Sequence, residues 1–451
     1  MLGAILGLVV VAGLPATLDP AALVGDLGSP RYLQREAAEA ALARLGRDAL
    51  PSLRAARDAR DPEVRVRASA ILARIEGTLL VQPTPIAFDF HAAPIGEVLR
   101  SINLRTGLAL KLDPEDDPAW ADTRVTLRTA EPLPFWKGVD SLCEAGRLHY
   151  GFGVQPPSGR RESVFPLYSG FAPPPEPVWD SGPFRTQLAS VHYQSEIQLS
   201  QARPATVREG GGQPTDEPAI PRSVAIRQFY LQFLLAAEPR LSITQNGSPR
   251  VIEAVDDRGK SLLIPAEQVT ALHSSGYFGM NPSPLVRFRV DLAYPETAGR
   301  RIGRLRGVMP VIAATRKPDP LLVPVPQAIG KTFRSDDIEL TVRDIRAATD
   351  DQGTTIELTL RSLGGAGAVG SEVDPMAARL ESPQQQLEIL GADGEPLGWF
   401  PSGSLFDGEE TRLTLSLMSR GEASKPAIIA YHGMTRLATE VPFEFRDVPI
   451  P

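Results

Sequence analysis

Cysteine and histidine are scarce in this chain of 451 residues, and their scarcity removes several kinds of site. The single cysteine, Cys143, cannot form an internal disulfide or build a multi-cysteine zinc site. It falls on the apolar face of an expected helix, so we predict a buried, unreactive thiol. The histidines contain no i, i+4 pair and no His-Glu-x-x-His sequence. They are His91, His149, His192, His273 and His432. The sequence therefore predicts no metal site.

Motifs of the common catalytic and cofactor sites are also missing. Neither a Gly-x-Ser-x-Gly elbow nor a dinucleotide-binding fingerprint occurs. Gly330-Lys331-Thr332 ends like a phosphate-binding loop, but Val325 stands where its first glycine should be. Acidic pairs such as Asp256-Asp257 lack the ligand spacing of an EF-hand, and aspartate favours turns. We expect no catalytic residue, no cofactor and no bound metal. A hydrolase with an unrecognised carboxylate pair is the least favoured alternative.

An excess of positive charge and long apolar runs are absent too. The formal net charge is −7, and phosphate contacts need a basic face, so we expect no nucleic-acid partner. One apolar run, Leu2 to Leu14, precedes Pro15-Ala16. Residues 1–17 resemble a secretory signal peptide, although no Lys or Arg precedes the run. The run is too short for a stable transmembrane helix, and no later segment could span a membrane. A buried helix or a misplaced start codon is the alternative.

Residues 18–80 have the pattern of short helices. Ser29-Pro30 and Asp61-Pro62 combine a capping side chain with a proline that needs no donor in the first turn. The stretches 46–54 and 61–68 resemble a HEAT repeat. Such arrays need at least about three units to bury a continuous core, and little more than one is present. We therefore expect this unit to pack against the next domain or a partner.

Residues 84–155 alternate between strand and helix periodicity twice, which predicts a compact β-α-β-β-α-β unit. The stretches 88–99, 106–110 and 125–127 resemble the short N-terminal module of secretins and TonB-dependent receptors. That resemblance implies a periplasmic protein-interaction domain. The segment between the halves, which contains Asp116, Asp117 and Trp120, is longer than usual. It is either a binding loop or an insertion, and these three residues are candidate partner-binding residues.

The residue pattern of the remaining chain predicts β structure. Residues 156–183 are rich in proline and are expected to form a linker. Two sets of short alternating strands, 184–326 and 327–451, favour two tandem antiparallel β-sandwiches of the immunoglobulin type. A single larger β-domain is the alternative. In the first set, Tyr277 and Phe278 lie in a glycine-flanked loop and are candidate contact residues.

The expected fold class is therefore multidomain α+β: HEAT-like hairpins, a small α/β module and two β-sandwiches. We expect a non-catalytic scaffold of the bacterial cell envelope, periplasmic or extracellular, that binds an envelope protein through the small module. A glycan-binding or adhesion protein that uses the β-sandwiches is the alternative.

The export hypothesis predicts a shortened N-terminus near residue 17, because the apolar run would be removed with the leader. Cell fractionation followed by N-terminal sequencing of the purified protein tests this. An unprocessed product in the cytoplasm would contradict it.

Overall fold

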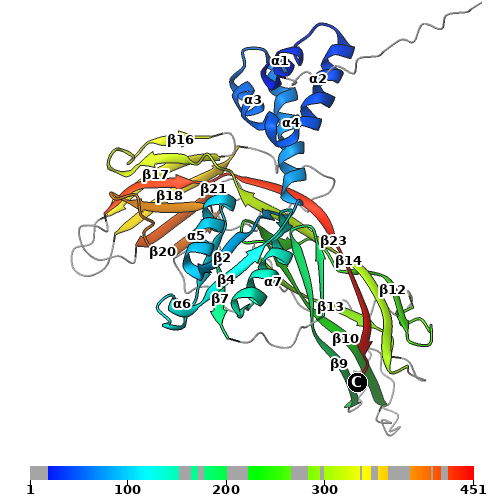
Figure 1. Ribbon diagram of the computed structural model, residues 1–451. Coiled ribbons are helices and arrows are strands. Elements are labelled where there is room, and N and C mark those ends of the chain that lie inside the picture. The colour runs from blue at the N-terminus through cyan, green and yellow to red at the C-terminus, as the bar shows by residue number, and fades with distance from the viewer. Residues whose placement is uncertain are drawn as a thin grey trace, which may run out of the picture. The chain divides into compact units, whose positions relative to one another are not determined.

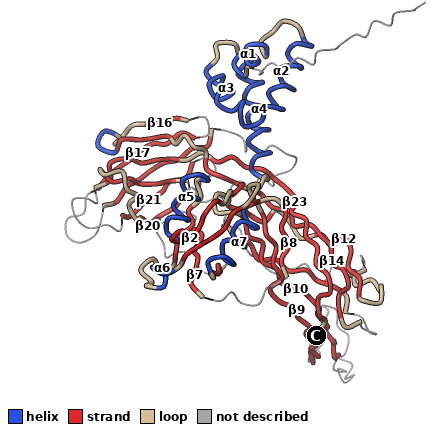
Figure 2. Tube along the Cα trace, in the orientation of Figure 1, coloured by secondary structure: helices blue, strands red, loops and turns tan. Residues whose placement is uncertain are grey.

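The computed structural model describes most of the chain as two compact units, residues 1–81 and 82–451 (Figure 1). The described ranges are 19–151, 164–170, 177–200, 222–265, 283–294, 299–335, 338–346, 354–363, 386–407, 410–417 and 425–451. The expected signal peptide lies outside them. Helices occur at the start of the chain, and mostly antiparallel sheets follow, as expected for an α+β protein (Figure 2). No helix in the described part is long and apolar enough to cross a bilayer.

The first unit is helical. It contains α1 (Pro20–Asp26), α2 (Tyr32–Leu45), α3 (Leu50–Ala55) and α4 (Pro62–Leu80). The Asp61 carboxylate accepts a hydrogen bond from the backbone N–H of Glu63, which starts α4 at the expected position. The core includes Leu42 and Ile71. Leu33 is 80% exposed, because α2 packs through the row of residues that contains Leu42.

The second unit begins with a small α/β module, residues 82–170. It contains β1 (Pro85–Ile86), β2 (Asp89–Pro94), α5 (Ile95–Thr106), β3 (Ala109–Leu112), α6 (Ala119–Asp122), β4 (Arg124–Arg128), β5 (Leu133–Pro134), α7 (Phe135–Gly146), β6 (Leu148–Tyr150) and β7 (Val164–Ser169). The apolar stripes of α5 and α7 face one core. Gly107, with φ +70°, ends α5 in the left-handed conformation that favours glycine.

The module differs from the expected unit in the number and pairing of its strands. β1 pairs with β5 and β2 with β4, while β7 lies between β3 and β6 in a separate sheet. β7 is parallel to β3 and antiparallel to β6. It comes from the proline-rich stretch that was expected to be a linker. The apolar side chains of Phe165 and Leu167 are buried in the module core, which explains why this stretch forms a strand.

The first β region consists of two antiparallel sheets. One has the order β13-β10-β9-β8 and the other contains β11-β14-β12. The strands are β8 (Val178–Ser181), β9 (Phe184–Ser200), β10 (Arg222–Ala237), β11 (Ser242–Gln245), β12 (Arg250–Asp256), β13 (Leu285–Leu292) and β14 (Arg301–Arg316). β8 also comes from the expected linker and extends the first sheet by pairing with β9.

The second β region has two sheets around one core, with strand orders β15-β22-β19 and β16-β17-β18-β21-β20. Its strands are β15 (Leu321–Pro324), β16 (Thr332–Arg334), β17 (Ile338–Arg346), β18 (Thr355–Ser362), β19 (Leu387–Gly391), β20 (Trp399–Phe406), β21 (Glu410–Leu417) and β22 (Pro426–Tyr431). Alternating burial along β17 and β18 matches their period-two pattern.

The last strand returns to the first β region. β23 (Met434–Pro449) pairs with β14 from Arg316↔Met434 to Arg301↔Pro449. Its Phe443 and Phe445 rings pack against Phe233 of β10. Strands from each side of the domain boundary expected between residues 326 and 327 therefore pair with strands of the other region. β15 joins the second region, whereas β23 joins the first.

The packing of β14 against β23 depends on Gly307. A Cβ atom there would collide with the Phe443 ring and lie 2.7 Å from the Arg250 carbonyl oxygen. We expect Gly307→Ala to lower the free energy of unfolding by about 1–3 kcal/mol, the usual cost of overpacking. Urea unfolding followed by circular dichroism measures the change. Gly96→Ala, where a Cβ meets nothing within 4 Å, is the control. An unchanged midpoint for Gly307→Ala would contradict the described pairing.

Candidate functional site

The loop that joins the two halves of the module is fixed by two of the predicted contact residues. The Asp117 carboxylate accepts hydrogen bonds from the Ala119 N–H at 2.8 Å and from the Ser169 hydroxyl at 3.0 Å. Trp120 is only 8% exposed, and its indole N–H donates to the Pro114 carbonyl at 2.6 Å. These side chains hold the loop against the module, whereas Asp116 is exposed. Tyr277 and Phe278 lie outside the described residues.

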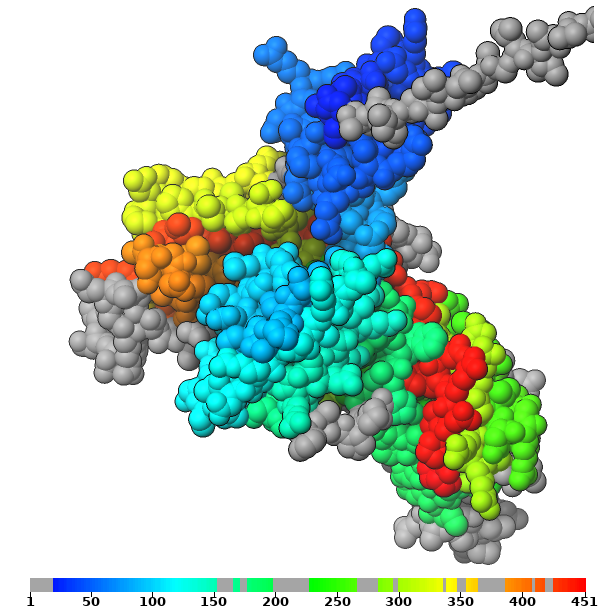
Figure 3. All heavy atoms as spheres, in the orientation of Figure 1, coloured from blue at the N-terminus to red at the C-terminus, as the bar shows by residue number. Residues whose placement is uncertain are grey.

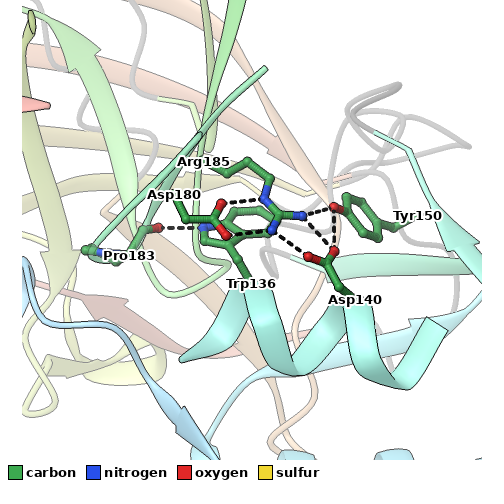
Figure 4. A network of polar contacts seen from close by, with 6 residues as sticks. All are labelled: Trp136, Asp140, Tyr150, Asp180, Pro183 and Arg185. Atoms are coloured by element: carbon green, nitrogen blue, oxygen red, sulfur yellow. Dashed lines mark hydrogen bonds and ion pairs between the residues drawn. The ribbon is translucent and has the colours of Figure 1, made fainter. Parts of the chain in front are cut away.

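A buried arginine joins the module to the first β region (Figure 4). Arg185, on β9, is 2% exposed and lies between Asp140 of α7 and Asp180 of β8. Its guanidinium donates to both oxygens of each carboxylate over 2.6–2.7 Å and also to the Tyr150 hydroxyl. It lies 5.0 Å from the Trp136 ring centroid. The indole N–H of Trp136 donates to the Pro183 carbonyl. We call the side chains of Arg185, Asp140, Asp180, Tyr150 and Trp136 the Arg185 joint.

The Arg185 joint is saturated with hydrogen bonds. All the donor nitrogens of the guanidinium are used. Burial alone would lower the pKa of Arg185, but the hydrogen bonds that it donates to Asp180 and Asp140 outweigh burial and raise that pKa. Burial also raises the pKa of Tyr150. Arg185 and Tyr150 therefore keep their protons near neutral pH, and the network links α7 and β6 of the module to β8 and β9.

A second buried ion pair fixes the start of the module. Glu238 is fully buried and accepts hydrogen bonds from the Thr84 N–H at 2.8 Å and the Thr84 hydroxyl at 2.5 Å. Arg240 donates to Glu238 at 2.9 Å and to the Gln82 carbonyl at 2.5 Å. Burial raises the pKa of Glu238, although Arg240 and Thr84 oppose this shift. The module is thus tied to the first β region at two separate points.

The face of the module around α5 contains an open groove. The groove lies between α5 and strand β3 and has a volume of about 680 Å³. Leu99, Leu110 and Leu112 line it, and Arg100, Lys111 and Glu115 add charged groups. Leu104, also in its lining, is 81% exposed. We call this feature the α5 groove. The atoms of the module, including α5, form part of the surface in Figure 3.

Strand β3 is one edge of its sheet. Within the described residues it pairs only with β7. Asn103 of α5 reaches this edge: its side-chain amide donates to the Leu110 carbonyl at 2.9 Å and its side-chain oxygen accepts from the Leu110 N–H at 3.0 Å. The groove therefore offers apolar side chains, a few charges and a partly occupied strand edge.

A second cluster lies on the outer face of the sheet that contains β9, β10 and β13. The Tyr230 ring stacks on His192, with centroids 4.7 Å apart, and on the Arg289 guanidinium, 3.7 Å from its centroid. His192 also contacts the Ser190 hydroxyl at 2.7 Å. Because β10 lies between β9 and β13, the two partners cover opposite faces of the Tyr230 ring. Among the described residues, no three His, Cys, Asp or Glu side chains are placed to hold a metal ion.

Sequence reasoning predicted a small α/β unit in this stretch but not these contacts. The acids of the loop were visible because aspartates cluster there, whereas Arg185 and Asn103 look like ordinary polar residues of a strand and a helix. The exposed Leu104 breaks the stripe formed by Ile95, Val98 and Ile102, and this was the one local signal for the groove.

The Cys143 thiol offers a test of the module core. Burial and the nearby Asp140 carboxylate raise the pKa of Cys143 to about 12, although Arg185 opposes the shift. The thiol should therefore stay protonated at pH 8, and iodoacetamide should modify it at least 100-fold more slowly than an unfolded thiol. Mass spectrometry measures the rate. Leu104→Cys in a Cys143→Ala background is the exposed control. Equal rates for the two thiols would contradict the buried position.

In comparisons with known proteins, no family model, no curated protein and no solved structure matches this chain.

Proposed function

We propose that this protein is a non-catalytic scaffold that binds a protein partner in the α5 groove. The observation that carries the proposal is the groove itself, which combines leucine side chains, charged groups and the exposed Leu104 on a module tied to a β-sheet by two buried ion pairs. Protein interfaces combine an apolar centre with a polar rim in this way. A rigid scaffold also reduces the entropy lost on binding.

Exposed apolar area supports this choice of surface. Leu104 projects from the last turns of α5 next to the buried Leu99 and the partly buried Leu112. A second, smaller hollow of about 120 Å³ lies beside the C-terminal part of the same helix, at Ile102 and Thr106. A partner that covers α5 would bury Leu104 and occupy both hollows.

The setting we propose is the bacterial cell envelope. The apolar N-terminus and the likeness of the module to the interaction domain of secretins and TonB-dependent receptors support it. The helical unit, too short for a continuous HEAT array, would add a second contact surface. The two β regions would act as immunoglobulin-like sandwiches that space these surfaces.

Glycan binding by the first β region is the alternative, and the stack of His192, Tyr230 and Arg289 is the observation that bears on it. Sugars bind aromatic rings through a free face, and both faces of Tyr230 are covered by its neighbours. A hydrolase built on Ser190 and His192 is less supported. A base of this kind needs a third group to orient it, and no carboxylate bonds to His192 in the described part of the chain.

Filling the groove should abolish partner binding. Gly96 lies on α5 in the groove lining, where a Cβ would meet nothing within 4 Å. Gly96→Trp should occupy the groove, while Gly96→Ala should leave it open and favour the helix by about 0.5–1 kcal/mol. The measurement is crosslinking in native cells from a photoreactive residue at position 104, with position 252 as the exposed control.

We expect discrete protein adducts from position 104 and none of the same mass from position 252. Gly96→Trp should reduce the adducts at least tenfold and Gly96→Ala should not. Adducts that survive Gly96→Trp would place the partner elsewhere. Absence of protein adducts, with retention of the protein on cell-wall polysaccharide, would favour the glycan alternative.

A further inference from the structure

Pro310 interrupts the pairing of β14 within its sheet. β11 and β12 both pair along one side of β14, because β23 pairs along the other side. The Pro310 carbonyl accepts a hydrogen bond from the Asn246 N–H at 3.0 Å, so Pro310 directs its backbone groups to the side of β11. Proline has no N–H, so a continuous partner strand would lack one donor at this position.

The chain leaves the β ladder opposite this proline. The ladder of β11 ends at Gln245, which pairs with Val311, and the ladder of β12 begins at Arg250, which pairs with Val308. The segment 246–249 between them forms a loop at the edge of the sheet. Apart from the Asn246 N–H, which bonds to the proline carbonyl, the backbone of this loop has no ladder bond to β14.

This loop contains an Asn-Gly pair whose side-chain amide and following N–H have no partner. Gly247 is exposed, and its φ of +114° is a conformation that favours glycine. The Gln245 side-chain amide donates to the Gly247 carbonyl at 2.9 Å, which holds that carbonyl but leaves the N–H of the same residue unused. Within the described residues, neither this N–H nor the Asn246 carboxamide makes a hydrogen bond. Because glycine has no Cβ, nothing on it hinders the approach of its nitrogen to the preceding side chain.

The other two asparagines of the chain lack this combination. Asn103 lies within α5, and its carboxamide both donates to and accepts from the backbone of Leu110. In the sequence, Asn281 precedes Pro282, which has no N–H to lose. Asn246 is therefore the asparagine that combines an unbonded carboxamide with an unhindered backbone nitrogen.

We propose that Asn246-Gly247 is a modification site at which the chain deamidates spontaneously, with its own backbone as the nucleophile. The Gly247 nitrogen loses its proton and forms a bond to the side-chain carbonyl carbon of Asn246. The bond from that carbon to the amide nitrogen breaks, and the nitrogen leaves as ammonia with the proton. Water then opens the cyclic imide at either carbonyl and gives aspartate or isoaspartate. Water is the co-reactant, and no electrons are transferred.

The sheet should tolerate this change. Isoaspartate routes the main chain through the side-chain carbon between Asn246 and Gly247, which lies after the Asn246 N–H that bonds to Pro310. The ladder pairs of β11 and β12 lie outside the altered link. The product should therefore keep its fold and gain a negative charge at the sheet edge. This inference goes beyond the proposed function and does not rest on it.

Incubation of the folded full chain at pH 8 tests the proposal. A more acidic form should accumulate on ion-exchange chromatography, and mass spectrometry of peptides should place isoaspartate at position 246. Asn246→Gln is the matched control, because it keeps an amide but must close a larger, less favourable ring. It should form the acidic species at this position at least tenfold more slowly. The reaction of the unsubstituted chain should be slower at pH 7, because the deprotonated nitrogen is the attacking group.

Two further measurements make the test decisive. Asn246→Asp supplies the charge of the product, so it should elute with the acidic form and keep the urea midpoint of the unsubstituted chain. The chain unfolded in guanidinium chloride is the reference for an unprotected Asn-Gly pair. If position 246 stays asparagine in the folded chain while the unfolded chain reacts there, the proposal is overturned, because the fold would then protect the site. Equal accumulation of the acidic form in the Asn246→Gln chain would overturn it as well.

Discussion

The buried guanidinium of Arg185 is the interaction on which the arrangement of the second unit depends. Removing an arginine from water is costly, and it is tolerated here because two carboxylates and the Tyr150 hydroxyl satisfy it. Asp140 keeps 47% of its side chain exposed and Asp180 keeps 26%, so the acids remain partly hydrated and the desolvation cost falls mainly on the arginine. The same group joins α7 and β6 of the module to β8 and β9 of the sheet.

This joint gives the two similar halves of the module different roles. α7 turns Phe135 and Trp136 into the core and directs Asp140 to Arg185, so its partner is the rest of its own chain. α5 occupies the matching place in the first half: its stripe packs into the same core, and its Leu104 is exposed beside the groove. Of these two helices, α7 is the one that contributes side chains to the Arg185 joint.

Strand β23 imposes a second constraint, because it determines how the two β regions are connected along the chain. β14 and β23 are neighbours in one sheet, and the whole second β region, β15 to β22, lies between them in sequence. The second region is therefore an insertion into the first and not a tandem copy that follows it. The aromatic cluster of Phe233, Phe288, Phe443 and Phe445 forms only when the end of the chain is present. Gly307 permits the close contact that this cluster requires.

The sequence by itself determined the local elements: the start of α4 at Asp61-Pro62, the apolar stripes of α5 and α7, the alternating strands and the buried position of Cys143. These follow from caps and periodicities that span a few residues. Only the tertiary structure decided that β7 enters the module sheet, that β23 returns to β14, that Arg185 meets Asp140, and that the Asn103 carboxamide bonds to the backbone of Leu110. Arg185 and Asp140 are 45 positions apart, and such partners leave no periodic trace, because pairing depends on where distant segments meet. The described parts of the expected linker form two strands for the same reason: β7 buries Phe165 and Leu167 in the module core, and β8 pairs with β9.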